Sequence, residues 1–422
     1  MKLILKILVL VVLIISLVGC SALEAETSNS DKEVVDYPEV EIEPISGLKD
    51  DFIRGMDVSM LEQIENNGGK FYDQNAEKDA LKILKDYGVN YVRLRLWNNP
   101  AGKGGGNCDL ERVKNLAVRA EKLGMMIFLD VHYSDFWADP NSQTKPEAWQ
   151  DLSFSELKTA VYDFTYNSLQ ELHEAGATPD MVQIGNELNN GMLWPEGKIW
   201  AKTDETIGGF AQFAQLLDRG LKAVEDFSRT KKIEIKTVVH LADGGDNDLY
   251  RWFFDELIAR GVTNFDVIGV SYYPYWHGTF AELKNNLNDI SQRYDKEVSV
   301  VETAYAFTLH NGDDLNNIVG SSQIDLVDQF DGKDDRDYPA TIQGQADVVR
   351  RIMKIVNEVP NNKGLGVFYW EGEWIPVEGA GWKAGQGNAW ENQAMFDFAG
   401  NALPSLNLFN EVVDDQLYKR SE

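Results

Sequence analysis

Short apolar runs rich in β-branched residues alternate with longer amphipathic stretches along most of this chain. Runs of this length and composition predict buried strands, and apolar residues that recur with a period of 3.6 predict helices. The predicted strands cover 55–60, 91–97, 126–133, 181–187, 236–241, 266–274, 298–305 and 364–371. The predicted helices cover 75–87, 109–123, 153–175, 207–227, 248–260, 279–295, 341–357 and 404–412.

Local signals mark several helix ends. Ser153 with Glu156 fits a capping box at a helix start. Gly88, Gly124 and Gly261 each follow a predicted helix, where a left-handed residue commonly ends it. Eight strand–helix pairs over about 370 residues predict an α/β fold, a (β/α)₈ TIM barrel forming a single catalytic domain over 47–415. The alternative is a doubly wound open sheet, which would need a glycine-rich turn that GMDVSM (55–60) lacks.

Two of the predicted strands end in a lone carboxylate. MVQIGNELNNG (181–191) presents Glu187, and VSVVETAY (298–305) presents Glu302. The alternative for each is a helix cap or an ion pair with arginine. Because barrel chemistry lies at the C-terminal ends of the strands, the pair favours a two-carboxylate active site.

Other polar and aromatic residues cluster at the same strand ends. Arg93 and Arg95 share one strand face, and we expect one to hold a carboxylate ionised and the other to form a structural ion pair. The candidates for substrate binding are Asp57, Arg95, Trp97, His132, Asp135, Trp137, Asn186, His240, Tyr273, Trp276 and Trp370.

Ten of the eleven tryptophans fall at these strand ends or in the loops after them, and only Trp252 falls in a helix. Core packing would spread them over helix faces as well. Indole rings on one rim suit the apolar faces of sugar rings, so two acids among them favour glycoside hydrolysis. A metal-dependent hydrolase fits less well, because only five histidines occur and no strand carries an H-x-H pair. We expect no cofactor for catalysis.

Charge narrows the ligand class. The 422-residue chain carries a formal charge of −28, which argues against nucleic acid and suits a neutral ligand. We expect a monomer.

The N-terminus predicts export. Lys2 and Lys6 precede an apolar run, which ends Leu17-Val18-Gly19-Cys20. This ending resembles the bacterial lipobox and predicts a lipoprotein signal peptide over 1–19 with lipid on Cys20. The alternative is a simple export signal. The polar, acidic stretch 20–46 then predicts a flexible tether, and the protein is expected outside the cytoplasm, anchored to a membrane at the cell surface.

Seven motifs together resemble family 53 of the glycoside hydrolases, the arabinogalactan endo-β-1,4-galactanases, over about 55–408. They are GMDVSMLEQIENNGGKFYD, NYVRLRLWNNP, FLDVHYSDFWADP, QIGNELNNGMLWP, VIGVSYYPYWHG, VVETAY and GVFYWEGEWIP. The resemblance implies a retaining hydrolase of β-1,4-galactan in pectin side chains, with Glu187 as general acid/base and Glu302 as nucleophile. The alternatives are a related barrel glycosidase that cuts mannan or xylan, and a surface protein that only binds glycan. The latter would not need both glutamates.

The resemblance also implies a structural calcium ion between the loops after strands 7 and 8. Its candidate ligands are Asn311, Asp313, Asn317, Asn388 and Glu391, oxygen donors of the kind calcium prefers. Leu315 departs from the family pattern, where a histidine is expected. The alternative is an ordinary polar turn.

Overall fold

The computed structural model describes residues 36–100, 102–200, 207–330 and 337–413, without the side chains of 328–330. The predicted signal peptide and Cys20 lie outside the described residues. Within the described ranges, no helix is both long and apolar enough to cross a bilayer.

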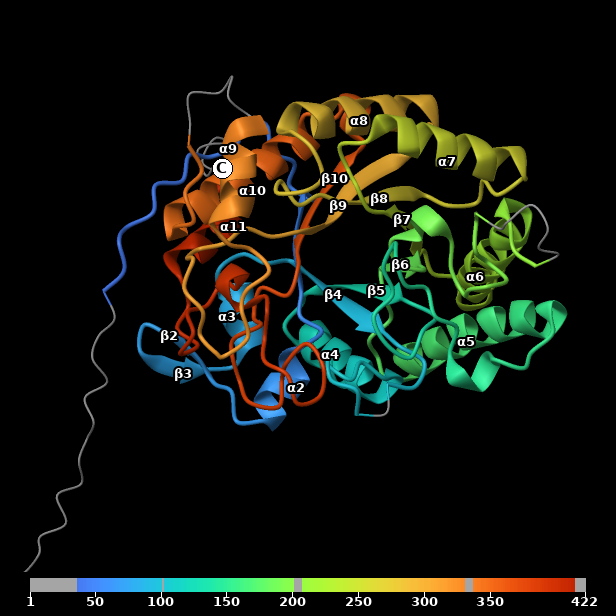
Figure 1. The fold of residues 1–422 in the computed structure, drawn as a ribbon, viewed down its shortest axis with the longest axis horizontal. Coiled ribbons are helices and arrows are strands. Elements are labelled where there is room, and N and C mark those ends of the chain that lie inside the picture. Colours follow the sequence, from blue (N-terminus) through green and yellow to red (C-terminus); the bar gives the residue numbers. More distant parts are fainter. Residues whose placement is uncertain (1–35, 101, 201–206, 331–336, 414–422) are drawn as a thin grey trace, which may run out of the picture. The chain divides into compact units, whose positions relative to one another are not determined.

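Eight parallel strands close into a barrel in the order β1-β10-β9-β8-β7-β6-β5-β4, with the helices around it (Figure 1). The predicted TIM barrel is therefore confirmed. The barrel strands are β1 Ile53–Asp57, β4 Tyr91–Leu96, β5 Met126–Val131, β6 Met181–Ile184, β7 Lys236–Leu241, β8 Val267–Ser271, β9 Glu297–Thr303 and β10 Gly364–Tyr369.

A helix follows each barrel strand, as the sequence predicts. The helices are α2 Leu61–Asn66, α3 Ala80–Asp86, α4 Leu110–Lys122, α5 Phe154–Glu174, α6 Phe210–Lys231, α7 Asn247–Ala259, α8 Phe280–Arg293, α9 Ser321–Phe330, α10 Ile342–Asn357 and α11 Leu408–Glu411. Ser153 and Glu156 form the predicted capping box of α5. Gly88, Gly124 and Gly261 have positive φ after the ends of α3, α4 and α7. The sequence predicted neither α2 nor α9.

The barrel interior changes from apolar to polar along the strands. One residue from each strand forms an apolar plug: Ile53, Tyr91, Phe128, Met181, Val238, Val267, Val301 and Phe368. Two residues further along, the inward positions are polar on four adjacent strands, at Arg93, Asp130, Gln183 and His240, all buried. The plug thus forms a dry base beneath a polar layer at the C-terminal end.

The predicted helix at 75–87 starts too early. Phe71–Asp73 (β2) and Ala76–Lys78 (β3) pair as an antiparallel hairpin instead. The two residues between them, Gln74 and Asn75, both have positive φ, as a tight two-residue hairpin turn requires. Asp79 then caps α3 by accepting a hydrogen bond from the Lys82 N–H.

The predicted tether boundary at residue 46 is wrong, because the segment 37–46 contacts the barrel domain. The Tyr37 hydroxyl donates to Asp397, and Glu41 exchanges backbone hydrogen bonds with the Gln343 side chain on α10. Ile45 is buried, and its N–H donates to the Val412 carbonyl oxygen. The barrel domain therefore begins at Tyr37.

Candidate active site

Glu187 and Glu302 line one pocket of about 160 Å³ at the C-terminal end of the barrel. Glu302 lies near the end of β9, and Glu187 follows β6 after Gly185 and Asn186. Glu187 has φ 47° and ψ 61°, a left-handed conformation that is costly for a residue with a side chain. Tyr133 and Glu371, which follow β5 and β10, share this feature. Such conformations persist where surrounding contacts hold them, and they cluster at functional sites.

Glu302 is held by a cation and a hydroxyl group. Its Oε1 lies 2.8 Å from Arg93 Nη2, and its Oε2 accepts a hydrogen bond of 3.1 Å from the Tyr273 hydroxyl. The Glu302 residue is only 6% exposed. Of the two strand arginines, Arg93 is therefore the one that favours an ionised carboxylate at this position.

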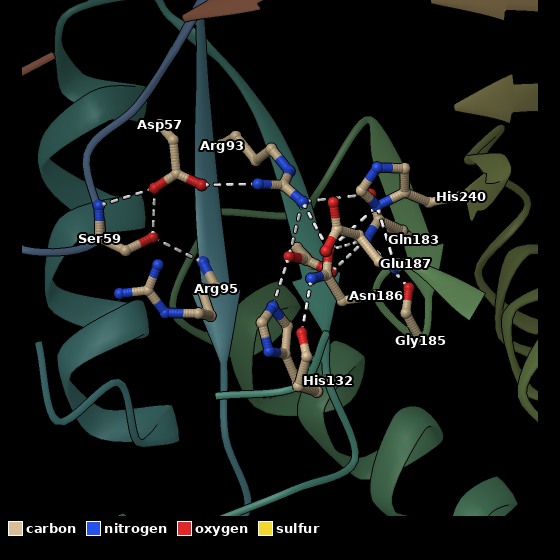
Figure 2. Close-up of polar contacts among 12 residues, drawn as sticks. Asp57, Ser59, Arg93, Arg95, His132, Gln183, Gly185, Asn186, Glu187 and His240 are labelled. Carbon is tan, nitrogen blue, oxygen red and sulfur yellow. Dashed lines mark hydrogen bonds and ion pairs between the residues drawn. The ribbon is translucent and has the colours of Figure 1, made fainter. Parts of the chain in front are cut away.

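Arg93 joins three buried carboxylates. Besides Glu302, its guanidinium contacts Asp57 at 2.9 Å and Asp130 at 2.7 Å. Its Nη2 also donates to Asn186 Oδ1 at 3.2 Å (Figure 2). Burial by itself would raise the pKa of Asp130, but Arg93 and His132 leave that pKa below its ordinary value. This network fixes Glu302 and Asn186 relative to each other.

Glu187 has a different environment. The neighbouring residue Asn186 connects this part of the chain to the polar layer. Its side-chain oxygen accepts a hydrogen bond from Gln183, and its side-chain nitrogen donates one to the Ala138 carbonyl oxygen. His240 Nε2 lies 2.8 Å from the Ser271 hydroxyl, and Ser271 in turn hydrogen-bonds to Glu187. Among the described residues, Glu187 forms no salt bridge with a cationic side chain.

The two acids consequently titrate differently. Burial and the neighbouring Glu302 charge raise the pKa of Glu187 well above its ordinary value. Burial also raises the pKa of Glu302, to about 7, but Arg93 and the Tyr273 hydroxyl oppose that rise. Glu302 is therefore the acid that ionises first, and Glu187 is the acid that keeps its proton.

Two buried histidines of the site, His132 in the pocket lining and His240 beneath it, favour the neutral form. The Trp97 indole N–H can only donate, so His132 Nδ1 accepts it at 3.1 Å and His132 Nε2 carries the proton donated to Asp130. Burial lowers the pKa of His132, and it lowers that of His240 further.

Arg95 forms a second buried ion pair. Its Nη1 lies 2.7 Å from Glu371 Oε1, and its guanidinium carbon lies 4.2 Å from the centre of the Trp137 ring. Trp137 stacks on Trp382 with ring centres 4.8 Å apart and an interplanar angle of 22°. Arg95 thus supports an aromatic wall of the pocket, which five tryptophans line: Trp137, Trp276, Trp370, Trp382 and Trp390.

Seven of the predicted substrate-binding residues line the pocket: Arg95, His132, Trp137, Asn186, Tyr273, Trp276 and Trp370. The other four do not. Asp57 is buried and bonds to Ser59 and Arg93, and Trp97 and His240 are buried beneath the pocket. Asp135 accepts backbone hydrogen bonds from Asn99 and Glu147 and faces a neighbouring cleft.

Sequence analysis missed four lining residues: Ala138, Asp139, Trp382 and Trp390. Both tryptophans follow β10 and belong to the ten that the sequence places at strand ends or in the loops after them. Their spacing in the sequence did not show which of the ten line the pocket and which only pack within a loop. Asp139 lies six residues beyond the left-handed Tyr133, so its position depends on the path of the loop.

The predicted calcium ligands lie where two loops meet. Asp313 Oδ2 accepts the Asn388 N–H at 2.6 Å, and Glu391 Oε1 accepts the N–H groups of Gly312 and Asp313. Glu391 Oε2 is buried without a hydrogen-bond partner. In the described ranges, no group of three or more His, Cys, Asp and Glu side chains could hold a metal ion. A calcium ion at these loops would therefore need the amide oxygens of the asparagines as ligands, besides the carboxylates of Asp313 and Glu391. An orphaned carboxylate oxygen beside further oxygen donors fits a cation, and calcium stays a prediction.

Comparison with known proteins gives a consistent result. Residues 53–409 match the family described as glycosyl hydrolase family 53. The chain is 36% identical over 414 residues to an endo-beta-1,4-galactanase of Bacillus subtilis (strain 168), covering 90% of each chain. It is 42% identical over 366 residues to an uncharacterized protein in the bgaB 5′ region of Niallia circulans, covering 86% of this chain and 95% of that one. The solved GH53 catalytic domain of Ignisphaera aggregans superimposes with a TM-score of 0.81 at 48% identity, covering 89% of this chain and all of that one.

Proposed function

Because the chain belongs to glycosyl hydrolase family 53, we propose that it is an endo-β-1,4-galactanase acting on the galactan of type I arabinogalactan and pectin side chains. The observation that carries the proposal is the pair Glu187 and Glu302 in one pocket walled by tryptophans. The Bacillus subtilis relative bears this activity in its name. A neutral galactan also suits a chain of charge −28, which would repel anionic polymers.

We propose a double displacement with retention. Glu302, ionised beside Arg93, attacks the anomeric carbon while protonated Glu187 gives its proton to the departing glycosidic oxygen. The bond from the anomeric carbon to that oxygen breaks, and a covalent galactosyl–Glu302 ester forms. Glu187, now ionised, takes a proton from water, which attacks the anomeric carbon and releases Glu302. Asn186, held by Arg93 and Gln183, is placed to bind a hydroxyl group next to the reacting carbon.

Substrate class is tested by measuring product release from linear galactan, mannan, xylan and carboxymethylcellulose side by side. We expect rapid release of oligosaccharides from galactan alone. Comparable release from mannan or xylan would identify another barrel glycosidase, and binding of galactan without release would identify a glycan-binding protein.

The stereochemistry is tested by following the first product by NMR. A retaining reaction requires the two carboxyl groups to lie about 5–5.5 Å apart. Its first product from β-1,4-galactan is the β-anomer. First appearance of the α-anomer would contradict the mechanism.

We propose further that the protein is exported and held at the cell surface by lipid on Cys20. The basic Lys2 and Lys6, the apolar run and Leu17-Val18-Gly19-Cys20 support this. Palmitate labelling and fractionation test it. Wild-type protein is expected in the membrane fraction with label, and Cys20→Ala without label. Unlabelled wild-type protein in the medium would contradict the anchor.

A further inference from the structure

The one tryptophan that the sequence places in a helix has an unusual partner. Trp252 on α7 stacks face to face with Trp200, with ring centres 4.7 Å apart and planes 10° from parallel. Trp200 lies in the segment between β6 and α6 and is 59% exposed, more than any other large hydrophobic residue described. Trp252 therefore covers one face of the Trp200 ring, while more than half of the Trp200 surface stays exposed.

Further side chains pack against Trp252, the more buried member of the stacked pair. Phe210 packs edge-on against Trp252 with ring centres 5.6 Å apart, and the Arg260 guanidinium lies 4.8 Å from the Phe210 ring centre. Trp252 is itself partly buried against the hydrophobic core. A ring held on a fixed support loses little conformational freedom when a ligand stacks on it, so the exposed indole is preorganised.

A second, polar cleft adjoins the catalytic pocket at Trp276 and includes the first turn of α7, the helix that carries Trp252. Trp276 lines both the pocket that holds Glu187 and Glu302 and a second cleft of about 490 Å³ formed by the loops after β7 and β8. The second cleft extends to Asp248 in the first turn of α7. Asp248 and Trp252 are four residues apart and so share one helix face, with the Trp252 ring leaning back over the preceding turn. In Figure 1, α7 and α8 run beside each other above the strands.

The lining of this cleft selects a neutral ligand. It carries the acidic side chains Asp243, Asp246, Asp248 and Glu282, with Asn247 and His277. Carboxylate and amide groups can bind sugar hydroxyls, while the excess of negative charge repels uronic acids and phosphates. Trp276 in this cleft is 41% exposed and Trp200 is 59% exposed, so each offers a flat apolar face to a pyranose ring.

We propose that Trp200, backed by Trp252, is a distal binding site for the galactan chain, reached from the catalytic pocket through the acidic cleft beyond Trp276. The inference rests on the proposed galactanase function and extends it to polymer length. Long chains reach both the reacting glutamates and Trp200, whereas short oligosaccharides fill only the catalytic pocket.

The test compares Trp200→Ala with wild type on long linear galactan and on galactotetraose. Loss of one stacking contact should raise KM for the polymer about two- to tenfold and leave kcat within twofold. Galactotetraose hydrolysis should stay within twofold. Trp200→Phe keeps a stacking face and should restore most of the polymer KM. Met126→Ala is the matched control, because Met126 is 45% exposed but begins β5 at the opposite end of the barrel.

Native electrophoresis in gels containing galactan gives an independent reading. Wild type should be retarded, Trp200→Ala should be retarded less, and polygalacturonate should retard neither. An unchanged polymer KM and unchanged retardation in Trp200→Ala would overturn the proposal, as would an equal loss on galactotetraose. Absence of galactan cleavage by wild type would contradict the proposed function instead, and retardation that depends on Trp200 would still support the binding site.

Discussion

Replacing Tyr273 by phenylalanine removes one of the two interactions that favour the ionised form of Glu302. The Tyr273 hydroxyl donates to Glu302 Oε2 at 3.1 Å, and the substitution removes only that oxygen. A hydrogen bond to a charged group contributes about 1.5–3 kcal/mol, and one pKa unit corresponds to about 1.4 kcal/mol. The bond stabilises the ionised form and lowers the pKa of Glu302. Its loss should therefore raise that pKa by about one to two units.

The assay is the pH profile of kcat/KM on galactotetraose, whose acidic limb should report Glu302, the proposed nucleophile, in the free enzyme. In Tyr273→Phe this limb should move about one to two units towards higher pH, with activity on the plateau much less affected. Tyr272→Phe is the matched control, because the neighbouring Tyr272 hydroxyl donates to the Gly278 carbonyl oxygen, 2.9 Å away. An acidic limb that does not move, with activity lowered equally at every pH, would refute the reasoning.

Four further results are expected. Glu187→Ala should still form the covalent intermediate from an aryl galactoside with a good leaving group, and azide should restore its turnover, whereas fluorosugar labelling of Glu187 or Glu371 in place of Glu302 would reverse the assignment. Glu373 is buried, and neither of its carboxylate oxygens has a hydrogen-bond partner. Burial and the Glu371 charge raise the pKa of Glu373 well above its ordinary value. The folded protein therefore keeps a proton on Glu373 that the unfolded chain loses above about pH 4.5. Stability should fall as pH rises from there, and Glu373→Gln should flatten the decline of Tm between pH 5 and 8 while the exposed Glu378→Gln does not. Deleting residues 1–46 should lower the free energy of unfolding by about 2–4 kcal/mol through loss of Ile45 burial and its hydrogen bonds, whereas deleting 1–36 should leave it unchanged in denaturant titrations. Calcium should raise Tm and chelation should reverse this, and Glu391→Gln should abolish the response; a wild-type Tm that ignores calcium would make these loops an ordinary polar turn.

The sequence predicted the barrel and its two glutamates because both depend on short-range patterns. Eight apolar runs and the polar residues at their ends are visible without any knowledge of strand order. The segment 37–46 was mispredicted for the opposite reason: its polar composition resembles a tether. Its contacts with Gln343, Arg350 and Val412 lie more than 300 residues away in the chain, where no local pattern reports them.

The division of roles between the two strand arginines could not be predicted either. Arg93 and Arg95 share a face, so periodicity treats them alike, yet they lie at different heights in the barrel. Arg93 pairs in register with Phe128 of the plug layer and reaches Asp130 and Glu302, whereas Arg95 pairs with Asp130 in register and reaches Glu371. How far each arginine lies above the plug depends on the register between neighbouring strands, and that register cannot be predicted from a single sequence.

That height also explains how the barrel separates the two acids. The apolar plug excludes water from beneath the polar layer, so charges there interact strongly and each must find a partner. Arg93 supplies one cation to Asp57, Asp130 and Glu302, and that cation keeps Glu302 the easier acid to ionise. Glu187 follows β6, three strands along the barrel from β9, which carries Glu302. It receives only neutral donors, so burial leaves it protonated. A single buried arginine two residues above the plug therefore gives two chemically identical side chains opposite preferences for the proton, as the proposed mechanism requires.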